Sequence, residues 1–370
     1  QIRWIWHSLQ GIILKNISVS DNVKTNYFKG DKEMKKLKVG IIGVGTLGYE
    51  HACNIATRVP GSELVAICDG NLARAQEVAD ELGVSAVYSD PKAMCEDPNV
   101  EAVAIVTGTA SHVDMIEIAM NAGKHVFCEK PLAENVEKCK RAEAIIAAHP
   151  DLVFMLGFMR RFDRSYRIAK EKIERGDIGD IVLVRCYSED PIAIIERTLE
   201  FAPRSGGQFI DMSIHDIDLI RWLTGSEPKN LWAIGGCYEF KQYKDWDDGD
   251  NVSCLMQMEN DVMAFFFAGR AAAHGSHVET EIVGTHGALR ISAIPTDSML
   301  EVYSENGVCR ECYQTFVARW HEAYVSELEV FCDYVAKKAA ATPNVFDGTK
   351  STAIAFKCKE SFLKNERITM

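Results

Sequence analysis

The first part of the chain, up to about residue 157, alternates short apolar runs with longer segments in which apolar residues recur at helical spacing. The short runs are rich in β-branched residues and predict strands, whereas the longer segments end at Gly or Pro and predict helices. Strands separated by helices indicate a parallel sheet with helices on both faces. The predicted strands are Val39–Ile42, Leu64–Cys68, Val84–Tyr88, Ala102–Val106, His125–Cys128 and Leu152–Leu156, and the predicted helices are Glu50–Val59, Asn71–Leu82, Ser111–Asn121 and Ala133–Ala148.

The second part of the chain, from residue 158, has a different pattern in which strands dominate. Their residues alternate in polarity, which is typical of a large, mostly antiparallel open sheet with one covered face. We therefore expect an α+β domain after the α/β domain. The predicted strands are Ile181–Tyr187, Leu231–Ile234, Val252–Met258, Val262–Ala268, Val278–Val283, Ala288–Ile291 and Leu300–Tyr303, and the predicted helices are Arg164–Arg175, one within Ser205–Gly225, Glu322–Ala339 and Gly348–Lys364.

Residues 1–34 stand outside this pattern. Their apolar patches are interrupted by Arg3, His7 and Lys15, so the segment is too short and too polar to span a membrane. It also lacks the pattern of a secretory signal peptide. We expect this extension to be disordered, or to be sequence added upstream of a natural start at Met34.

A glycine turn joins the first predicted strand to the helix that follows it. Gly43, Gly45 and Gly48 have G-x-G-x-x-G spacing, with Thr46 and Leu47 between them at the expected helix N-terminus. The first glycine permits the tight turn, the second lets the backbone approach a pyrophosphate, and the third lets the helix pack close to the strand. The free N–H groups of the helix then favour phosphate binding. The pattern predicts a dinucleotide site.

Asp69 favours a dinucleotide site over the alternative, which is a strand–turn–helix that binds no ligand. It ends the second predicted strand, about 20 residues beyond the last glycine, as the dinucleotide fingerprint requires. A carboxylate at this point accepts hydrogen bonds from both ribose hydroxyls and repels a 2′-phosphate. The predicted cofactor is therefore NAD, with NADP as the less favoured alternative.

Polar residues also follow two later strands of the predicted parallel sheet. Thr107, Thr109 and His112 come after one strand, and Glu129 and Lys130 come after the next. Ligands of open α/β sheets bind beyond the carboxyl ends of the strands, so all five are candidate cofactor contacts. A lysine at such a point is often only a solvated charge. The position of Lys130 beside the expected nicotinamide favours a catalytic role instead.

The segment from Gly206 to Gly225 reads as a helix that is apolar almost all round and therefore buried. Asp211, His215 and Asp218 lie on one stripe of that helix, at i, i+4 and i+7. Buried polar groups need partners or a ligand cavity. We assign Asp218 to a structural hydrogen-bond network, and Asp211 and His215 to chemistry, because a nearby carboxylate can raise the basicity of an imidazole.

Composition and charge narrow the function classes. Hydrophobic residues make up 47% and charged residues 25%, and the formal net charge is −12, which argues against nucleic acid or a membrane surface as the main partner. The twelve cysteines are scattered, as free thiols of a reducing compartment are, so we expect a cytoplasmic protein. Cys309 and Cys312 form one C-x-x-C pair without two further ligands, and we predict no metal site.

Several motifs together resemble the Gfo/Idh/MocA oxidoreductases, and within them the inositol 2-dehydrogenases. These are the glycine turn, Glu129-Lys130-Pro131, the stretch from Gly157 to Asp163, and the segment from Ser205 to Asp218. The resemblance extends from Leu37 to the C-terminus. It implies a Rossmann NAD-binding domain over residues 35–157 and a substrate-binding and oligomerisation domain over residues 158–370, whose sheet mediates a homo-tetramer.

The resemblance also implies a catalytic set of Lys130, Asp211 and His215. His215 would act as general base toward the reacting hydroxyl, Lys130 would stabilise the developing negative charge, and Asp211 would orient and tune the pair. Arg160, Asp190 and His274 match positions that face the substrate in relatives, as do the three catalytic residues.

The activity implied by the resemblance is NAD-dependent oxidation of a cyclic polyol in inositol catabolism. The predicted reaction converts myo-inositol to 2-keto-myo-inositol (scyllo-inosose). Ser188 and Ser276 replace larger polar residues of some relatives, so scyllo-inositol or another sugar or polyol stays open as substrate. Two further alternatives are an NAD-dependent glycosidase of the same fold and a non-catalytic NAD-bound sensor. The presence of the whole catalytic set speaks against the sensor.

Overall fold

The computed structural model describes residues 35–291, 296–305 and 307–370. The expectations for residues 1–34, including a start at Met34, lie outside the described residues. The chain divides into two compact units, residues 1–36 and Leu37–Met370, and the second contains every described helix and strand. In that described part, no helix has both the length and the apolar character that crossing a bilayer requires.

The first sheet is parallel and has the strand order β3-β2-β1-β4-β5-β6. This confirms the predicted α/β sheet, and the order reverses direction between β1 and β4, where ligands of such sheets bind. The strands are β1 (Leu37–Ile42), β2 (Ser62–Cys68), β3 (Ala86–Tyr88), β4 (Ala102–Ile105), β5 (His125–Glu129) and β6 (Phe154–Gly157). The connecting helices are α2 (Thr46–Thr57), α3 (Leu72–Leu82), α4 (Pro91–Glu96), η1 (Thr109–Ser111), α5 (His112–Asn121) and α6 (Val136–Ala147).

Local capping explains two of the differences between these helices and the predicted ranges. The short helix α4 was missed, although Asp90 caps it and Pro91 stands in its first turn. Helix α6 begins at Val136 rather than Ala133 because the Asn135 side chain accepts a hydrogen bond from the Lys138 amide. Helix α2 begins directly after Gly45, four residues before the predicted start.

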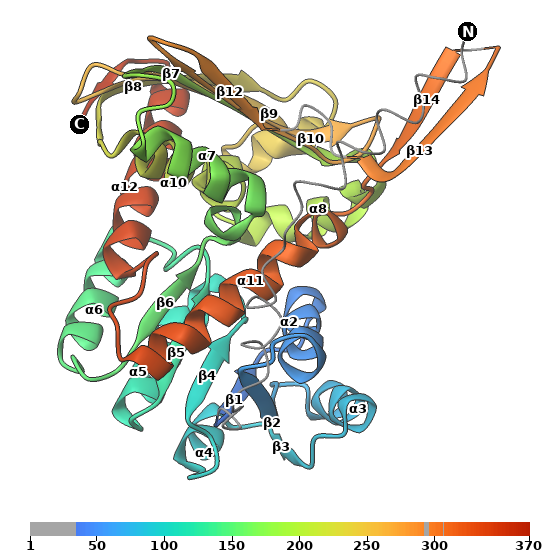
Figure 1. The fold of residues 1–370 in the computed structure, drawn as a ribbon, viewed down its shortest axis with the longest axis vertical. Helices are drawn as coiled ribbons and strands as arrows, with labels where there is room; N and C mark the ends of the chain where they lie inside the picture. Colours follow the sequence, from blue (N-terminus) through green and yellow to red (C-terminus); the bar gives the residue numbers. More distant parts are fainter. Residues whose placement is uncertain (1–34, 292–295, 306) are drawn as a thin grey trace, which may run out of the picture. The chain divides into compact units, whose positions relative to one another are not determined.

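The second sheet has seven strands in the order β12-β11-β7-β10-β9-β8-β15. Its neighbouring strands are antiparallel except for β7 and β10, so the predicted mostly antiparallel sheet is confirmed. The strands are β7 (Ile181–Pro191), β8 (Pro228–Gly236), β9 (Asn251–Met258), β10 (Met263–Ala272), β11 (His277–Gly284), β12 (Ala288–Ile291) and β15 (Ile368–Thr369). A separate hairpin of β13 (Thr296–Ser304) and β14 (Gly307–Cys312) projects from this layer in Figure 1.

Helices cover one face of the second sheet, and the two last helices also reach the first sheet. Apolar side chains of α7, α10 and α12 form one core with this sheet. Helix α11 crosses in front of the parallel sheet in Figure 1 and adds Val325, Leu328 and Phe331 to its core. The remaining helices are α7 (Arg164–Glu174), α8 (Ile195–Phe201), α9 (Gln208–Asp211), α10 (Ile214–Thr224), α11 (Phe316–Lys337) and α12 (Val345–Lys364), with 3-10 turns η2 (Met159–Phe162), η3 (Ile192–Ile194), η4 (Ala202–Arg204) and η5 (Lys241–Trp246).

The segment after Gly206 contains two helices, so the prediction of one continuous helix is wrong. The amides of Met212 and Ser213 both donate to the carbonyl of Gln208, which closes α9 after a single turn. Helix α10 then starts a new hydrogen-bond series at Ile214. The single polar stripe through Asp211 and the residues of α10 therefore does not exist.

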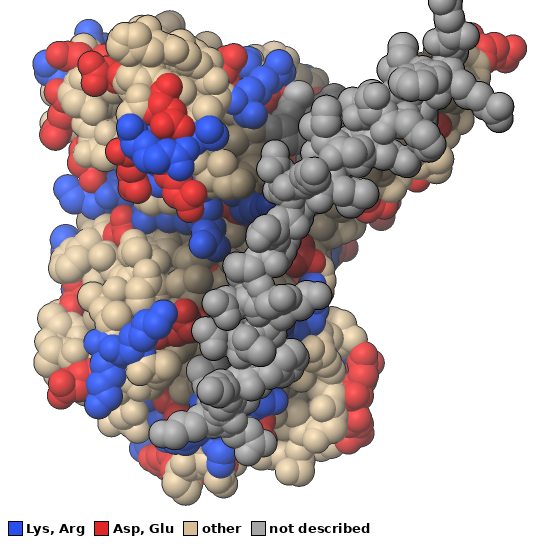
Figure 2. All heavy atoms as spheres, in the orientation of Figure 1, with Lys and Arg blue, Asp and Glu red and all other residues tan. Residues whose placement is uncertain are grey.

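The surface carries both signs of charge. Figure 2 shows Lys and Arg side chains interspersed with Asp and Glu over the face in view, without separate acidic and basic halves. The negative net charge of the sequence is therefore not gathered into one acidic region on this face.

Candidate active site

A first cavity lies beyond the carboxyl ends of β1, β2 and β4. It has a volume of about 460 Å³, and Gly43, Gly45, Asp69 and Thr107 are among the residues that line it. We call it the glycine-turn cavity. Its position at the point where the strand order reverses is the position expected for a dinucleotide.

The glycines of the turn have the predicted roles. Gly43 has a φ of +91°, and a Cβ there would stand 2.6 Å from the carbonyl oxygen of Val106. A Cβ on Gly48 would stand 2.0 Å from the Gly43 carbonyl oxygen, so only glycine lets α2 pack this close. A Cβ on Gly45 would meet no atom within 4 Å, which leaves its backbone open to a ligand. These residues fit a bound pyrophosphate.

Asp69 lies at the edge of the glycine-turn cavity and also braces the turn. Its Oδ2 accepts a hydrogen bond of 2.9 Å from the Val44 amide, and its Oδ1 accepts one of 2.8 Å from the Asn71 amide. The carboxylate is thus held in place where the fingerprint puts the ribose. Arg74 donates to the Val44 carbonyl at 3.2 Å from the same side.

Five of the predicted cofactor contacts line neither the glycine-turn cavity nor the second cavity described below, namely Thr46, Gly48, Thr109, His112 and Glu129. His112 is buried, with Nδ1 2.8 Å from the Pro131 carbonyl oxygen and Nε2 3.1 Å from the Thr107 carbonyl oxygen, so it joins the two strand-end loops. Burial lowers the pKa of this imidazole. Thr109 lies in η1, and Thr46 is the first residue of α2. The strand-end position was read correctly, but it does not fix where a side chain points.

Glu129 is likewise turned into the protein. It is only 4% exposed, and its Oε1 lies 2.9 Å from Nε2 of His51. Its Oε2 accepts a 3.0 Å hydrogen bond from the Lys130 amide. In this structure the Glu129 carboxylate supports the backbone of the lysine, and a contact of this residue with the cofactor stays a prediction.

A second cavity brings together the catalytic candidates from distant parts of the chain. Its volume is about 410 Å³, within the range of small-molecule sites. We call it the lysine cavity. Predicted residues on its wall are Leu47, Lys130, Arg160, Asp190, Asp211 and His215, and unpredicted ones include Met212, Arg270, Ser276, Trp320 and Tyr324.

Lys130 and Asp211 are held together in this cavity by a third residue, Arg270. The Lys130 ammonium donates a 2.9 Å hydrogen bond to the Asp211 carbonyl oxygen and lies 3.8 Å from Oδ1 of the same residue. Arg270 is buried and pairs with Asp211 at 2.7 Å and with Asp190 at 2.8 Å. Burial by itself raises the pKa of Asp211, but Arg270 and then Lys130 outweigh it and hold that pKa below its usual value.

His215 is buried on the wall of the lysine cavity with a neutral imidazole. Its pKa lies well below the usual 6.5, because of burial first and then the charges of Lys130 and Arg160. Its Nδ1 has no hydrogen-bond partner among the described residues. The prediction that Asp211 raises the basicity of His215 is wrong, because the carboxylate is engaged by Arg270. A neutral imidazole can nevertheless accept a proton.

Arg160 lines the cavity, but its guanidinium is already engaged. Nη1 donates to Asp216 at 2.6 Å and to the Ser188 hydroxyl at 3.0 Å, and Cζ lies 5.3 Å from the ring centre of Trp320. Ser188 also donates to Asp216 at 2.8 Å. Arg160 therefore forms part of the cavity wall while its guanidinium stays in a buried ion pair with Asp216.

His274 is the one predicted substrate residue that lies elsewhere. Gly275, with a φ of +116°, turns the chain between β10 and β11, and Ser276 faces the lysine cavity in place of His274. The imidazole of His274 instead contacts His277, with 3.3 Å between Nε2 and Nδ1. It borders a separate cavity beside the hairpin, with Asp297. His274 therefore does not line the lysine cavity, and its role at the substrate stays a prediction.

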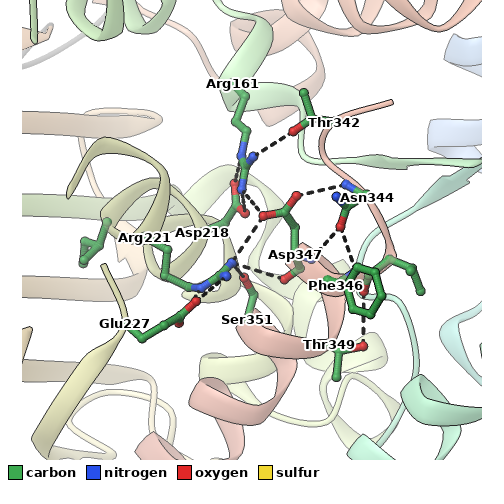
Figure 3. A network of polar contacts seen from close by, with 12 residues as sticks. Arg161, Asp218, Arg221, Glu227, Thr342, Asn344, Phe346, Asp347, Thr349 and Ser351 are labelled. Carbon is green, nitrogen blue, oxygen red and sulfur yellow. Dashed lines mark hydrogen bonds and ion pairs between the residues drawn. The ribbon is translucent and has the colours of Figure 1, made fainter. Parts of the chain in front are cut away.

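Asp218 belongs to the structural network that was predicted for it, drawn in Figure 3. Arg161 of η2 pairs with both oxygens of Asp218, at 2.8 and 2.6 Å, and with Asp347 of α12 at 3.0 Å. Arg221 extends the network to Glu227 at 2.7 Å. These buried ion pairs tie η2, α10 and α12 together behind the cavity wall.

Two family models match the chain in succession. Residues 37–158 match the "Oxidoreductase family, NAD-binding Rossmann fold", and residues 166–290 match the "GFO/IDH/MocA C-terminal domain". The match to the first model confirms the predicted Rossmann fold and NAD as the cofactor.

Named relatives cover almost the whole of the described fold. The scyllo-inositol 2-dehydrogenase (NAD(+)) of Bacillus subtilis (strain 168) is 33% identical, over 88% of this chain and 94% of the relative. The structure of scyllo-inositol dehydrogenase from Lactobacillus casei with bound NAD(H) and scyllo-inositol is 42% identical, with a TM-score of 0.87 over 90% of this chain and 99% of that one. The myo-inositol 2-dehydrogenase structure from Lactobacillus plantarum is 37% identical, with a TM-score of 0.88 over 91% and 100%.

Proposed function

Because this chain belongs to the Gfo/Idh/MocA oxidoreductase family, we propose that it oxidises one CH–OH group of an inositol ring and passes the hydride to NAD. Membership in this family confirms the predicted resemblance. It also confirms the predicted enzyme class, an NAD-dependent oxidoreductase that acts on CH–OH groups. The observation that carries the inositol proposal is the convergence of Lys130, Asp211 and His215 on one cavity of ligand size.

The residues of the lysine cavity divide the proton chemistry between them. His215, neutral because its pKa is lowered, accepts the proton of the reacting hydroxyl. The Lys130 ammonium donates a hydrogen bond to the same oxygen and stabilises the negative charge that develops there. Asp211 and Arg270 fix the ammonium in this position through the contacts described above.

The cofactor residues are those of the glycine turn. Gly43, Gly45 and Gly48 with the first turn of α2 hold the pyrophosphate, and Asp69 holds the adenosine ribose. Leu47, from the same turn, lines the lysine cavity, so the turn contributes residues to both cavities. NAD, when bound, supplies the ring carbon that accepts the hydride.

The isomer is proposed from two observations that point to different inositols. The family resemblance implied myo-inositol, whereas the identity to the L. casei scyllo-inositol dehydrogenase, 42%, exceeds the 37% to the L. plantarum myo-inositol enzyme. Oxidation of myo-inositol at C2 and oxidation of scyllo-inositol give the same ketone, 2-keto-myo-inositol. We propose myo-inositol as substrate, with scyllo-inositol as the second candidate.

A polyol panel with NAD⁺ and with NADP⁺ tests this proposal. We expect steady accumulation of NADH with myo-inositol or scyllo-inositol, and a slower reaction with glucose and with NADP⁺. Turnover of a glycoside without net NADH would support the glycosidase alternative. Binding of NAD without oxidation of any polyol would support the sensor alternative, and either result would overturn the proposal.

The proposed enzyme is a homo-oligomer, a tetramer as in the family resemblance, in the cytoplasm. The face of the second sheet opposite its helices exposes large apolar side chains, including Trp232, Ile234, Leu255 and Met263 at 46 to 54%. Apolar patches of this kind mark protein interfaces. All twelve cysteines are free, which supports a reducing compartment.

A further inference from the structure

Three titratable side chains meet in the interior directly behind Lys130. His51 comes from α2, Glu129 from the end of β5, and Glu327 from the middle of α11. They are 0%, 4% and 0% exposed, and one nitrogen or carboxylate oxygen of each lies within 4.8 Å of those of the other two. None of the three lines the lysine cavity. We call them the His–Glu–Glu cluster.

Only one of the two carboxylates in this cluster is fully satisfied by hydrogen bonds. Glu129 has a partner on each oxygen, namely the His51 ring and the Lys130 amide, at 2.9 and 3.0 Å. Both oxygens of Glu327 and Nδ1 of His51 are buried without a hydrogen-bond partner among the described residues. An ionised carboxylate in such a place would be strongly destabilising.

A proton held on Glu327 resolves this imbalance. Two carboxylates that lie close together in a protein interior do not both ionise, and the one with fewer partners keeps its proton. Burial, and then the charge of Glu129, raise the pKa of Glu327 well above its usual value. Phe127 and Tyr324 close the cluster, with ring centres 5.4 and 5.3 Å from that of His51.

The cluster is linked to the reacting groups through the backbone of Lys130. Glu129 holds the Lys130 amide, while the ammonium of the same residue reaches the Asp211 carbonyl on the other side. Tyr324 stands one turn before Glu327 on α11 and lines the lysine cavity. A shift of the Glu129 carboxylate would therefore move the lysine relative to the cavity wall.

We propose that Glu327 is a positioning residue of the reaction, which carries a proton and, together with His51, holds the Glu129 carboxylate on the amide of Lys130. The proposal rests on the proposed function only for its kinetic readout. Glu327 touches neither polyol nor cofactor, and it acts by keeping the lysine in place.

The protonation of Glu327 is tested by thermal unfolding of the wild type, E327Q and the control E329Q between about pH 5 and pH 8. A glutamate ionises in the unfolded chain near pH 4.3. Because the folded protein keeps the proton to a higher pH, wild-type stability falls as the pH rises through this range. The amide introduced by E327Q has no proton to lose, so we expect the Tm advantage of this variant over the wild type to grow with pH, by roughly 3 °C or more.

The control residue lies on the same helix as Glu327. Glu329 is exposed on α11, so E329Q is expected to follow the wild type at every pH. A Tm difference between E327Q and the wild type that does not change with pH would show that Glu327 is ionised in the folded protein and would overturn the proposal. A stoichiometric divalent cation found by elemental analysis of the purified protein would overturn it as well.

Kinetics test the positioning role. We expect E327L to lower kcat about tenfold or more while the Kd for NAD stays within about twofold, and E327Q to recover most of that loss. Equal losses of kcat in E327Q and E327L would overturn the role of the proton. If E327L does not fold, a kcat of E327Q that matches the wild type supports the role and a tenfold loss overturns it. A wild-type protein that oxidises no polyol would contradict the proposed function. The unfolding comparison would still decide whether Glu327 is protonated.

Discussion

At the scale of single residues, Lys130 owes its position to contacts from both halves of the chain. Its amide is held by Glu129 within the parallel sheet, and its ammonium reaches the carbonyl of Asp211 in α9. Arg270, from β10, holds the Asp211 side chain. The ammonium is thus oriented before any ligand binds, which is the arrangement that electrostatic catalysis requires.

Substitution of this lysine separates catalysis from cofactor binding. K130A is expected to lower kcat by about 10²- to 10⁴-fold, because the developing negative charge loses its hydrogen-bond donor. The Kd for NAD, measured by fluorescence titration, is expected to change by less than about threefold. K140A is the matched control, since Lys140 is exposed on α6 and pairs only with Glu143 among the described residues. Equal losses in kcat and in NAD affinity would assign Lys130 to cofactor binding alone.

We expect the low pKa of His215, the proposed general base, to set the pH dependence of the reaction. Because burial, Lys130 and Arg160 lower that pKa well below 6.5, the imidazole stays neutral and able to accept a proton as the pH falls to that value. We therefore expect that protonation of His215 does not lower kcat/KM between about pH 8 and pH 6.5. The fall of kcat/KM caused by this protonation should occur at lower pH. The pH profile of the wild type checks this, with H274Q as control. An acid limb centred at or above pH 6.5 in both proteins would contradict it.

Sequence reasoning found the catalytic candidates but not their supporting residues. Lys130, Asp211 and His215 carry recognisable motifs, and the structure places all three on one cavity. Arg270 belongs to no such motif. Its role depends on ion pairs with residues 80 and 59 positions away in the chain, which the sequence does not reveal. The inward turn of the Glu129 side chain could not be predicted, because a place after a strand does not tell which way a side chain points.

At the scale of elements, the uncovered face of the second sheet is the main feature without a partner among the described residues. Strands β8, β9 and β10 bury alternate residues under the helices and expose the others, among them Trp232 and Leu255. Period-2 alternation normally places polar residues on an exposed face. We propose that a second copy of the chain covers these apolar residues.

A charge in the centre of this face is expected to weaken the assembly. L255E would place an ionised group in a desolvated interface, so its mass by light scattering should fall from that of a tetramer toward the 41.2 kDa of one chain. The control is L72E on α3, since Leu72 is 51% exposed against 54% for Leu255 but lies on another element. A wild type that is already monomeric would contradict the proposed oligomer.

Most elements could be predicted, and several exceptions have a physical cause. Most helices and strands with a clear apolar period were predicted to within about four residues, but α11 begins six residues before its predicted start at Glu322, and β14 was not predicted. The break between α9 and α10 was missed because Met212 and Ser213 do not interrupt the apolar pattern, and the turn is made by backbone hydrogen bonds to Gln208. The short helices α4 and α8 are about two turns long or less, which is too short for a helical period to show.

At the scale of the whole described fold, one cavity lies on the parallel sheet, a second lies between the two parts of the chain, and α11 packs against both layers. The parallel sheet provides the glycine-turn cavity at the reversal of its strand order, and the two parts of the chain together line the lysine cavity. Leu47 comes from the first part, while Trp320 and Tyr324 come from α11. The fold class could be read from hydrophobic periodicity, but the closing role of α11 could not, since it depends on contacts between distant segments.

The central claim is that Lys130 and His215 direct one ring hydroxyl so that the hydrogen on its carbon leaves as hydride to NAD. The most direct measurement follows deuterium from myo-inositol labelled at C2, with the reduced cofactor analysed by mass spectrometry and NMR. The account predicts NADH with one deuterium at C4 of the nicotinamide ring, and loss of that transfer in K130A and H215Q. Reduced cofactor without deuterium would contradict the claim. So would a result in which neither labelled myo-inositol nor unlabelled scyllo-inositol reduces NAD.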